Sequence, residues 1–370
     1  MSTFTADLKV LKGDLLFIKR AAGFRRGFHP ALNLLAVAVE DGYATTRFYN
    51  YEVAVTVSMP AVGDSTSFAV DMTALVDAVK AVGAKDIGTF TVNGDTLTVS
   101  ADGVAVTVPL AGAGLREDMP ARPVVDGGPM IAMAGAEFAR IGSVTATSVG
   151  QDDTLPVLTG VRVECSGNEV VAVTTDRFKL AVVEATNQIA AADAFVLLIP
   201  GRPFHHFAKR ADKSSEASVT VGANGMVSLV SDTCTVVVEQ LDYDFPKWRG
   251  LLPSEFKASF VFDSSALLRA VKALPKGAST INLHIEWGAV EVVGYNGRDE
   301  SPFSSMSLDV TEAECDYGMV IKFSAERVAA ILNSIPKGVK VRYSGTTPTR
   351  PAVFAWDGAR VLLMPIRIPQ

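Results

Sequence analysis

The sequence predicts an α+β protein of three similar domains, each built from two units that pair a helix with an antiparallel sheet. Two observations support this fold class. A strand–helix segment recurs along the chain, and alternating strands with hairpin turns fill the stretches between its copies. The 370 residues then hold about six units of roughly 60 residues. Paired units give domains at 1–124, 125–252 and 253–370.

The clearest repeat joins residues 68–82 (FAVDMTALVDAVKAV) and 260–274 (FVFDSSALLRAVKAL), which are identical at eight of fifteen positions. A third copy, KFSAERVAAILNSI, lies at 322–335. In each copy an Asp or Ser follows a short strand, where its side chain can accept a hydrogen bond from the first helical turn. A helix of about three turns is expected after it, ended by Pro or Gly.

Strands with hairpin turns are expected between these helices, because alternating apolar and polar residues flank glycine-containing turn sequences. Proline-rich segments near 120–123 and 251–253 match the proposed domain boundaries. The turns are predicted at Asn93-Gly94-Asp95, Asp102-Gly103, Ser166-Gly167-Asn168, Ala223-Asn224-Gly225 and Asp357-Gly358. An open solenoid is disfavoured, since the strand content is too high.

Composition excludes several classes of protein. Cys165, Cys234 and Cys315 are too few and too scattered for a disulfide framework or a zinc site. The N-terminal residues lack a signal-peptide pattern, and every apolar run is too short to cross a bilayer. A soluble cytoplasmic protein without membrane association is expected. The net charge of −6 argues, taken alone, against a nucleic-acid binder.

The net charge is negative, but the distribution of charge along the chain predicts basic helix faces. Three predicted helices each oppose an apolar face to a basic one, with Leu8, Leu11, Leu15 and Ile18 forming the first apolar face. Each basic face could be an ordinary solvated surface. Three such faces on one surface would instead form a path for a polyanion, contacting phosphates without reading sequence. The basic residues are Lys9, Lys12, Lys19 and Arg20; His206, Lys209, Arg210 and Lys213; and Arg269, Lys272 and Lys276.

No catalytic constellation is evident in the sequence. The isolated Gly112-Ala113-Gly114 lacks both a third glycine and the expected following helix, so a nucleotide site is not indicated. The four histidines are too scattered for a metal cluster, and Asp242 and Asp244 fit a solvated loop. We therefore expect a non-catalytic binding or scaffolding protein without cofactor or metal. An enzyme with an unfamiliar site on a repeated sheet scaffold is the alternative.

Four segments resemble the family of the bacterial sliding clamp, the beta subunit of DNA polymerase III. They are 155–161 (LPVLTGV), 173–182 (VTTDRFKLAV), 243–249 (YDFPKWR) followed by Leu252-Pro253, and 363–368 (LMPIRI). The resemblance extends over the whole chain in length and repeat order. It is specific in the second domain and at the C-terminus, and looser in the first domain.

The resemblance implies the DNA clamp fold and a homodimeric, head-to-tail ring around duplex DNA, with helices lining the pore. It implies a processivity factor in DNA replication that tethers the polymerase without catalysing a reaction and is nucleoid-associated. Polymerase, clamp loader and repair proteins would bind through short peptide motifs. A decoy or inhibitory clamp, which binds these partners without supporting replication, is a second alternative.

By position, the resemblance implies an apolar pocket for partner peptides, which suits aliphatic and aromatic anchors. The pocket residues are Leu155, Leu158, Thr175, Arg177, Phe178, Lys179, Leu180, Pro246, Leu251, Leu362, Met364, Pro365, Ile366 and Arg367. Leu158, Leu180 and Met364 could instead simply be core residues.

This sequence departs from the family within that pocket, because Arg177 and Phe178 replace a glycine and a histidine. A co-adapted partner motif or a narrower pocket is expected. In the first domain, residues 49–52 depart from the family's threonine-aspartate. Arg25 and Arg26 match a basic loop that faces DNA. With them, the DNA-facing set is Lys9, Lys12, Arg20, Arg25, Arg26, Lys209, Arg210, Arg269, Lys272 and Lys276.

Overall fold

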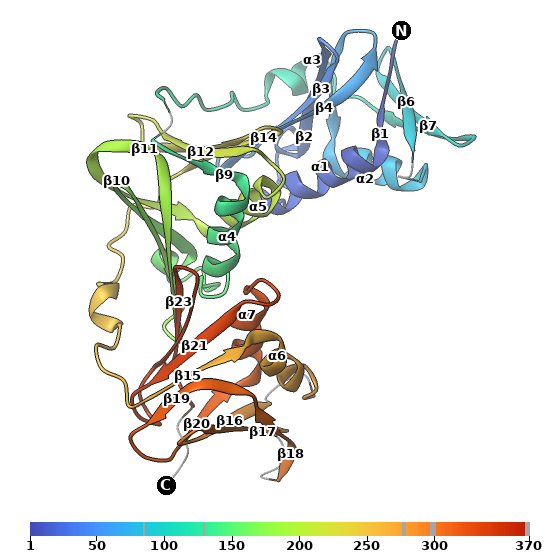
Figure 1. Cartoon of the computed structure of the whole chain (residues 1–370). Coiled ribbons are helices and arrows are strands. Elements are labelled where there is room, and N and C mark those ends of the chain that lie inside the picture. The colour runs from blue at the N-terminus through green and yellow to red at the C-terminus, as the bar shows by residue number, and fades with distance from the viewer. Residues whose placement is uncertain (84–85, 129, 276–278, 297–300, 367–370) are drawn as a thin grey trace. The chain divides into compact units, whose positions relative to one another are not determined.

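The computed structural model describes residues 1–370 except 84–85, 129, 276–278, 297–300 and 367–370. The chain forms two compact units. Unit 1 contains 1–139 and 199–240, and unit 2 contains 140–198 and 241–370. Both combine helices with antiparallel sheets (Figure 1), so the predicted α+β class is confirmed. Residues 125–252 contribute to both units, and the division into three domains stays a prediction.

Unit 1 is built on one branched, twelve-stranded sheet of order β8-β7-β6-β1-β4-β14-β13-β12-β9, in which β3 joins β4 to β2, and β2 joins β5. Helix α4 (Gly135–Thr145) begins in this unit and continues into unit 2. The other elements are β1 (Ser2–Asp7), α1 (Leu8–Ala21), η1 (Pro30–Asn33), β2 (Leu34–Glu40), β3 (Tyr43–Tyr49), β4 (Val53–Gly63), β5 (Thr66–Asp71), α2 (Met72–Ala81), β6 (Ile87–Asn93), β7 (Thr96–Ala101), β8 (Val104–Pro109), α3 (Ala113–Glu117), β9 (Ile131–Ala134), α5 (Gly201–Ala211), β12 (Glu216–Val221), β13 (Met226–Ser231) and β14 (Cys234–Glu239).

Unit 2 contains a seven-stranded sheet of order β10-β11-β23-β22-β21-β15-β19 and a four-stranded sheet of order β18-β17-β16-β20. Its elements are η2 (Pro156–Thr159), β10 (Gly160–Thr175), β11 (Lys179–Pro200), η3 (Trp248–Leu251), β15 (Ala258–Asp263), α6 (Ser264–Lys272), β16 (Thr280–Glu286), β17 (Ala289–Tyr295), β18 (Pro302–Leu308), β19 (Val310–Cys315), β20 (Met319–Ser324), α7 (Ala325–Asn333), β21 (Lys340–Gly345), β22 (Ala352–Trp356) and β23 (Ala359–Leu363).

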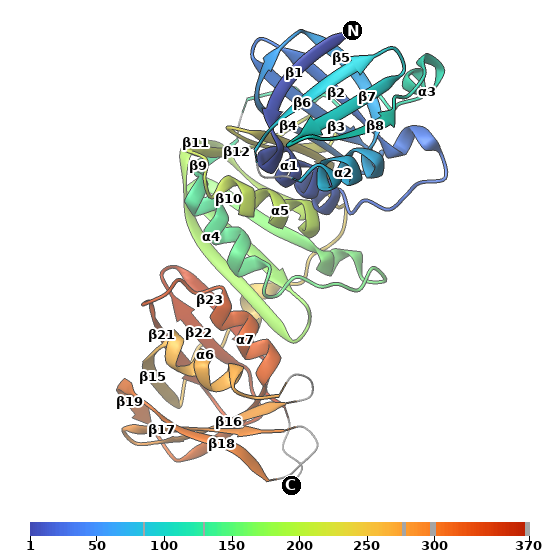
Figure 2. The same cartoon turned by 90° about the vertical axis from the view of Figure 1, so that its right-hand side faces the viewer.

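The helices lie against the sheets in groups. In unit 1, α1 packs against both α2 and α5, and in unit 2, α6 packs against α7 (Figure 2). Their apolar faces are buried, as the α1 residues Leu8, Leu11, Leu15 and Ile18 illustrate. The predicted apolar face of this helix is therefore confirmed. Among the described residues, no helix is long and apolar enough to cross a membrane.

The predicted caps are present in all three repeat copies. Asp71 accepts the N–H groups of Thr73 and Ala74 at 2.9 and 3.0 Å. Asp263 and Ser324 similarly cap α6 and α7. Such caps stabilise a helix by about 1 kcal/mol because they satisfy backbone donors that have no partner within the helix. The repeat therefore corresponds to a structural unit of strand, cap and helix.

One predicted turn is wrong. Residues 166–168 lie inside the continuous strand β10, and Gly167 takes a left-handed φ of 56° there. The Asn168 side chain donates to the carbonyl of Asn187 on β11 at 2.7 Å, which keeps the strand paired through this irregularity. The chain reverses instead at 176–178, between β10 and β11.

Candidate partner pocket and basic helix surfaces

The C-terminal segment lies beside the turn at 176–178, as the predicted pocket requires. Strands β11 and β23 pair antiparallel, with Leu180 opposite Leu362. Beyond β23, the N–H of Met364 donates to the carbonyl of Phe178 at 2.8 Å, and that of Ile366 donates to Lys322 at 2.7 Å. Residues from distant parts of the chain thus meet at one place in unit 2.

The floor of this region is a buried apolar cluster. Leu180 and Leu362 pack there with Trp248 and five other buried residues: Val173, Val182, Leu198, Phe245 and Val353. Leu158 and Thr175 are also buried. Phe178, Leu251 and Met364 are 45%, 51% and 36% exposed. The predicted set therefore separates into a buried floor and an accessible rim, and the exposure of Met364 is not that of a core residue.

The turn at 176–178 is held by the Asp176 carboxylate, which accepts the N–H groups of Phe178 at 2.9 Å and Lys179 at 2.6 Å. The Lys179 ammonium lies 3.3 Å from that carboxylate and also donates to the carbonyl of Thr147. Arg177 has a φ of 74°, in the left-handed region that only glycine enters without a steric cost. The backbone thus keeps a glycine conformation although the side chain is arginine.

An arginine that the sequence reading missed covers part of this rim. The guanidinium carbon of Arg327, on α7, lies 4.1 Å from the centre of the Phe178 ring, within the range of a cation–π interaction. The resemblance pointed to Phe178 but gave no signal for Arg327, because the contact joins two distant segments. The rim of this region therefore carries a cation on an aromatic ring.

The segment that carries Pro246 and Leu251 is anchored by Glu164 on β10. This carboxylate accepts from Trp248 Nε1 at 3.0 Å, Arg249 at 2.6 Å and Arg162 Nε at 2.7 Å. Burial raises the pKa of Glu164, but these hydrogen bonds outweigh it and lower the pKa to about 2. The charge is thus stabilised over a wide pH range.

Three predicted pocket residues remain. Leu155 begins a backbone turn, since its carbonyl accepts a hydrogen bond from the N–H of Leu158 at 2.9 Å. Pro365 is half-buried beside Met364 and Ile366. Arg367 lies outside the described residues.

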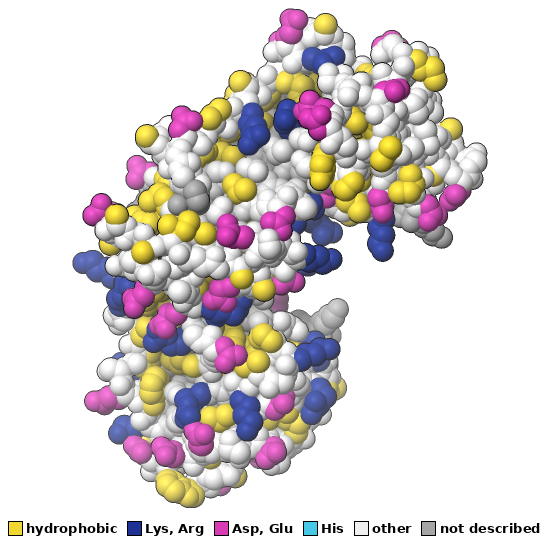
Figure 3. Space-filling model, turned by 45° about the horizontal axis from the view of Figure 1, so that its top comes forward, with side chains coloured by type: hydrophobic (Ala, Val, Ile, Leu, Met, Phe, Trp, Pro, Cys, Tyr) yellow, Lys and Arg dark blue, Asp and Glu magenta, His cyan; other side chains and the backbone are white. Residues whose placement is uncertain are grey.

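The predicted DNA-facing side chains of α1 point to solvent. Lys9, Lys12, Lys19 and Arg20 are exposed, as is Lys209 on the adjacent α5. Arg25 and Arg26 are exposed in the loop after α1, with Arg26 3.5 Å from the Asp71 carboxylate. In unit 2, Arg269 and Lys272 are exposed on α6, and Lys276 lies outside the described residues. The face in Figure 3 shows basic and acidic side chains interspersed over each unit.

Arg210 does not fit the predicted DNA-facing set. Its guanidinium lies 2.7 Å from the carboxylate of Asp14, whose side chain is only 3% exposed, and 5.0 Å from the Phe17 ring centre. Burial raises the pKa of Asp14, and the charge of Arg210 opposes that rise. The arginine is therefore held between α5 and α1 and is excluded from the DNA-facing proposal.

Two further basic side chains join this surface. Arg202 is exposed on α5 and lies against Gly23 at the end of α1. His206 is half-buried, and burial followed by the charges of Arg20, Arg202 and Lys209 lowers its pKa. The helical spacing had placed His206 on the basic face, whereas Arg202, in the first turn of α5, was not among the predicted basic residues.

The described part of the chain was expected to hold neither a metal cluster nor a nucleotide-binding loop. Among those residues, no group of three His, Cys, Asp or Glu side chains could hold a metal ion. A short helix, α3, does begin within the Gly112-Ala113-Gly114 segment, contrary to expectation, but it has only five residues.

Comparison with known proteins gives a consistent result. The family described as "DNA polymerase III beta subunit, central domain" matches residues 132–247. The Beta sliding clamp of Streptomyces coelicolor is 24% identical over 363 residues, covering 92% of each chain. A "Beta sliding clamp homolog GriR" from Streptomyces muensis is 24% identical over 379 residues, covering 98% of this chain and 99% of the relative.

Solved structures agree on the fold. The crystal structure of the DNA polymerase sliding clamp from Bacillus subtilis superposes with a TM-score of 0.83 at 16% identity, covering 100% of both chains. The sliding clamp from Pseudomonas aeruginosa, solved bound to griselimycin, gives 0.81 at 19% identity, covering 99% of this chain and 100% of that chain.

Proposed function

This chain belongs, as a divergent member, to the family of the bacterial DNA polymerase III beta subunit, and we propose on that premise that two copies close head to tail around duplex DNA. The family is that of the sliding clamps, which are non-catalytic processivity factors in DNA replication. The observation that carries the proposal is the full-length match to clamps, joined with a region where Phe178 and Met364 rim a buried apolar floor.

Two open sheet edges support the head-to-tail dimer. Strand β8 ends the sheet of unit 1, and β18 ends the four-stranded sheet of unit 2. Neither strand contains a charged residue, and most of their residues are exposed. Monomeric proteins usually protect such edges with charges or short strands. Strand addition between β8 of one copy and β18 of the next would satisfy both edges and generate a ring of two copies.

The oligomeric state of the purified chain tests this step. Wild type should sediment as a dimer at micromolar concentration and form rings in electron micrographs. Ala105→Lys places a charge on the β8 edge and should shift the protein toward monomer. Thr311→Lys, on the acidic edge strand β19, is the matched control and should remain dimeric. A wild-type monomer without rings would contradict the proposal.

DNA is proposed to be held topologically, with only weak phosphate contacts. The exposed cations of α1, α5 and α6 supply charge without sequence readout. Short linear DNA should therefore bind weakly, with an affinity that falls steeply with salt. Protein that has been loaded onto nicked circular DNA should stay bound at higher salt and should dissociate when the circle is cut. Equal retention on linear and circular DNA would refute topological binding. Association with the nucleoid follows from this proposal.

Partner proteins are proposed to bind the rim and floor formed by the turn at 176–178 and the C-terminal segment. Polymerase, clamp loader and repair proteins would insert short peptides with apolar anchors. Deleting 364–370 should abolish peptide binding and leave the dimer intact, because the proposed subunit edges are elsewhere. Unchanged affinity of a polymerase tail peptide would remove this assignment.

A decoy clamp is the second candidate, and the altered rim favours considering it. Arg177 and the Phe178–Arg327 pair change the mouth of the partner region, and one full-length relative bears the name of a clamp homolog. A primer-extension assay with loader and polymerase separates the two functions. Long products support the clamp function, whereas inhibition of the host clamp without long products supports a decoy.

A further inference from the structure

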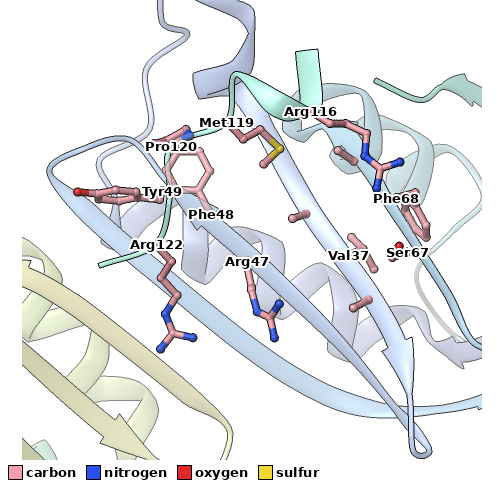
Figure 4. A pocket seen from close by; sticks show the side chains of 13 residues that line it. Val37, Arg47, Phe48, Tyr49, Ser67, Phe68, Arg116, Met119, Pro120 and Arg122 are labelled. Carbon is pink, nitrogen blue, oxygen red and sulfur yellow. The ribbon is translucent and has the colours of Figure 1, made fainter. Parts of the chain in front are cut away.

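A groove on unit 1 lies far along the chain from every predicted site residue of unit 2. It has a volume of about 330 Å³ and is formed by β2, β3, β5 and residues 116–122 (Figure 4). The register places Ala36 between Arg47 and Ala69, and Ala38 beside Ser67. These neighbours share one face of the sheet, so small side chains form a low floor.

The segment after α3 forms the other wall. Before α3, the chain runs along the edge of β5, where the N–H of Ala111 donates to the carbonyl of Ala69 at 2.8 Å. Met119 and Pro120 lie over the strands with Tyr49 and Phe48 nearby (Figure 4). The middle of the groove is therefore apolar, although it lies at the surface of the sheet.

Three arginines surround this apolar middle. Arg47 and Arg122 extend side by side at one end, and Arg116 lies beside Phe68 at the other (Figure 4). All three residues are exposed. None forms an ion pair within the described part of the chain, and the groove lining contains no Asp or Glu. Burial, followed by the charge of the neighbouring Arg47, lowers the pKa of Arg122.

We propose that this arginine groove binds a short acidic peptide segment of a partner protein. An apolar side chain of the peptide would rest on Ala36 and Ala38, and carboxylates on either side of it would pair with the arginines. The planar guanidinium group suits this role, because it can donate two parallel hydrogen bonds to one carboxylate. The site is separate in sequence and in unit from the predicted partner pocket.

The shape and surrounding charge favour a peptide over other anions. A small ligand gains affinity when its pocket buries most of its surface, whereas the arginines here are open to solvent. A larger partner can cover them itself. Nucleic acid is disfavoured because Glu117 and Asp118 are exposed beside the groove and Glu239 lies close enough to affect the pKa of Tyr49. These carboxylates would repel an extended polyanion.

Fluorescence anisotropy with the full chain tests the proposal. The probe is the labelled peptide Ser-Asp-Leu-Glu-Phe-Asp-Ser, and its comparison is the same peptide with Asn and Gln replacing the acids. The acidic peptide should bind at least about tenfold more tightly, since a tenfold ratio needs only about 1.4 kcal/mol. The double variant Arg47→Ala/Arg122→Ala should lose at least that factor. Arg350→Ala, an exposed arginine outside the groove, should bind like wild type.

A second variant tests shape without changing charge. Ala38→Leu fills the floor and should weaken peptide binding while circular dichroism shows an unchanged fold. The methyl NMR signals of Ala36 and Ala69 should shift when the peptide is added to wild type. Equal binding of the acidic and amide peptides, or unchanged binding by both variants, would overturn the proposal. Displacement of the peptide by equimolar octathymidylate or by 1-naphthoate would also overturn it, in favour of nucleic acid or a small anion.

Discussion

Replacing Arg177 by glycine should stabilise the protein, whereas replacing it by alanine should not. Arg177 has a φ of 74°, and a non-glycine residue pays about 1–2 kcal/mol in the left-handed region. Glycine removes that cost but increases the entropy of the unfolded chain by about 0.5–1 kcal/mol. Arg177→Gly should therefore exceed Arg177→Ala in stability by about 0.5–1 kcal/mol, because both variants lose the same charge.

Thermal unfolding of the full chain measures the difference, which should be about 1 °C in the midpoint for a chain of 370 residues. Lys247 provides the matched control, because it is exposed and has a φ of −71°. At this position glycine relieves nothing, so Lys247→Gly should be less stable than Lys247→Ala. Equal midpoints for the two Arg177 variants, or the same order at both positions, would refute the assignment of strain to the turn.

Three further results are expected. Glu164→Gln should lower the free energy of unfolding by about 1–3 kcal/mol at pH 7. The pKa of Glu164 is lowered to about 2 in the folded protein, from 4.5 in the unfolded chain. In wild type this stabilisation is therefore complete above pH 4.5 and is lost as the pH falls toward 2. A variant whose stability keeps the wild-type pH dependence would contradict this role of Glu164. Binding of short duplex DNA should strengthen as the pH falls below about 6.5, because phosphate favours the protonated form of His206, whose pKa is lowered in the free protein. His206→Ala should remove this part of the pH dependence in anisotropy titrations. Asp14→Leu alone should destabilise the protein by about 3–5 kcal/mol in urea unfolding, because half-buried Arg210 loses its carboxylate partner, whereas adding Arg210→Met should recover most of the loss.

The features that the sequence predicted well are local or repeated. The caps at Asp71 and Asp263 depend on a few neighbouring residues, and their recurrence revealed the strand–helix units. The turn at 166–168 failed because a glycine in the left-handed region can interrupt a strand without ending it. The sequence around Gly167 fits both a turn that ends the strand and an irregularity within it. Only the pairing of β10 with β11 distinguishes these two structures.

The features that the sequence missed join distant segments. Phe178 was identified by resemblance, but its contact with Arg327 depends on how α7 packs beside the turn. Arg210 was assigned to the DNA-facing set from helical spacing, which places it on the polar side of α5. The spacing could not show that α1 presents Asp14 there. Side-chain roles at the junction of two elements follow from packing, which a single helix projection does not contain.

The placement of the charges, and not their sum, decides whether an acidic chain can offer a basic helix face. Asp14 holds Arg210, Glu164 holds Arg162 and Arg249, and the lysines of α1 remain exposed. The side chains of Asp14 and Glu164 are paired and only 3% and 14% exposed, so they contribute little negative charge to any surface. The sum of −6 therefore says little about any one surface. If two copies close into the proposed ring, a few exposed cations suffice, since closure around DNA rather than affinity would prevent its escape.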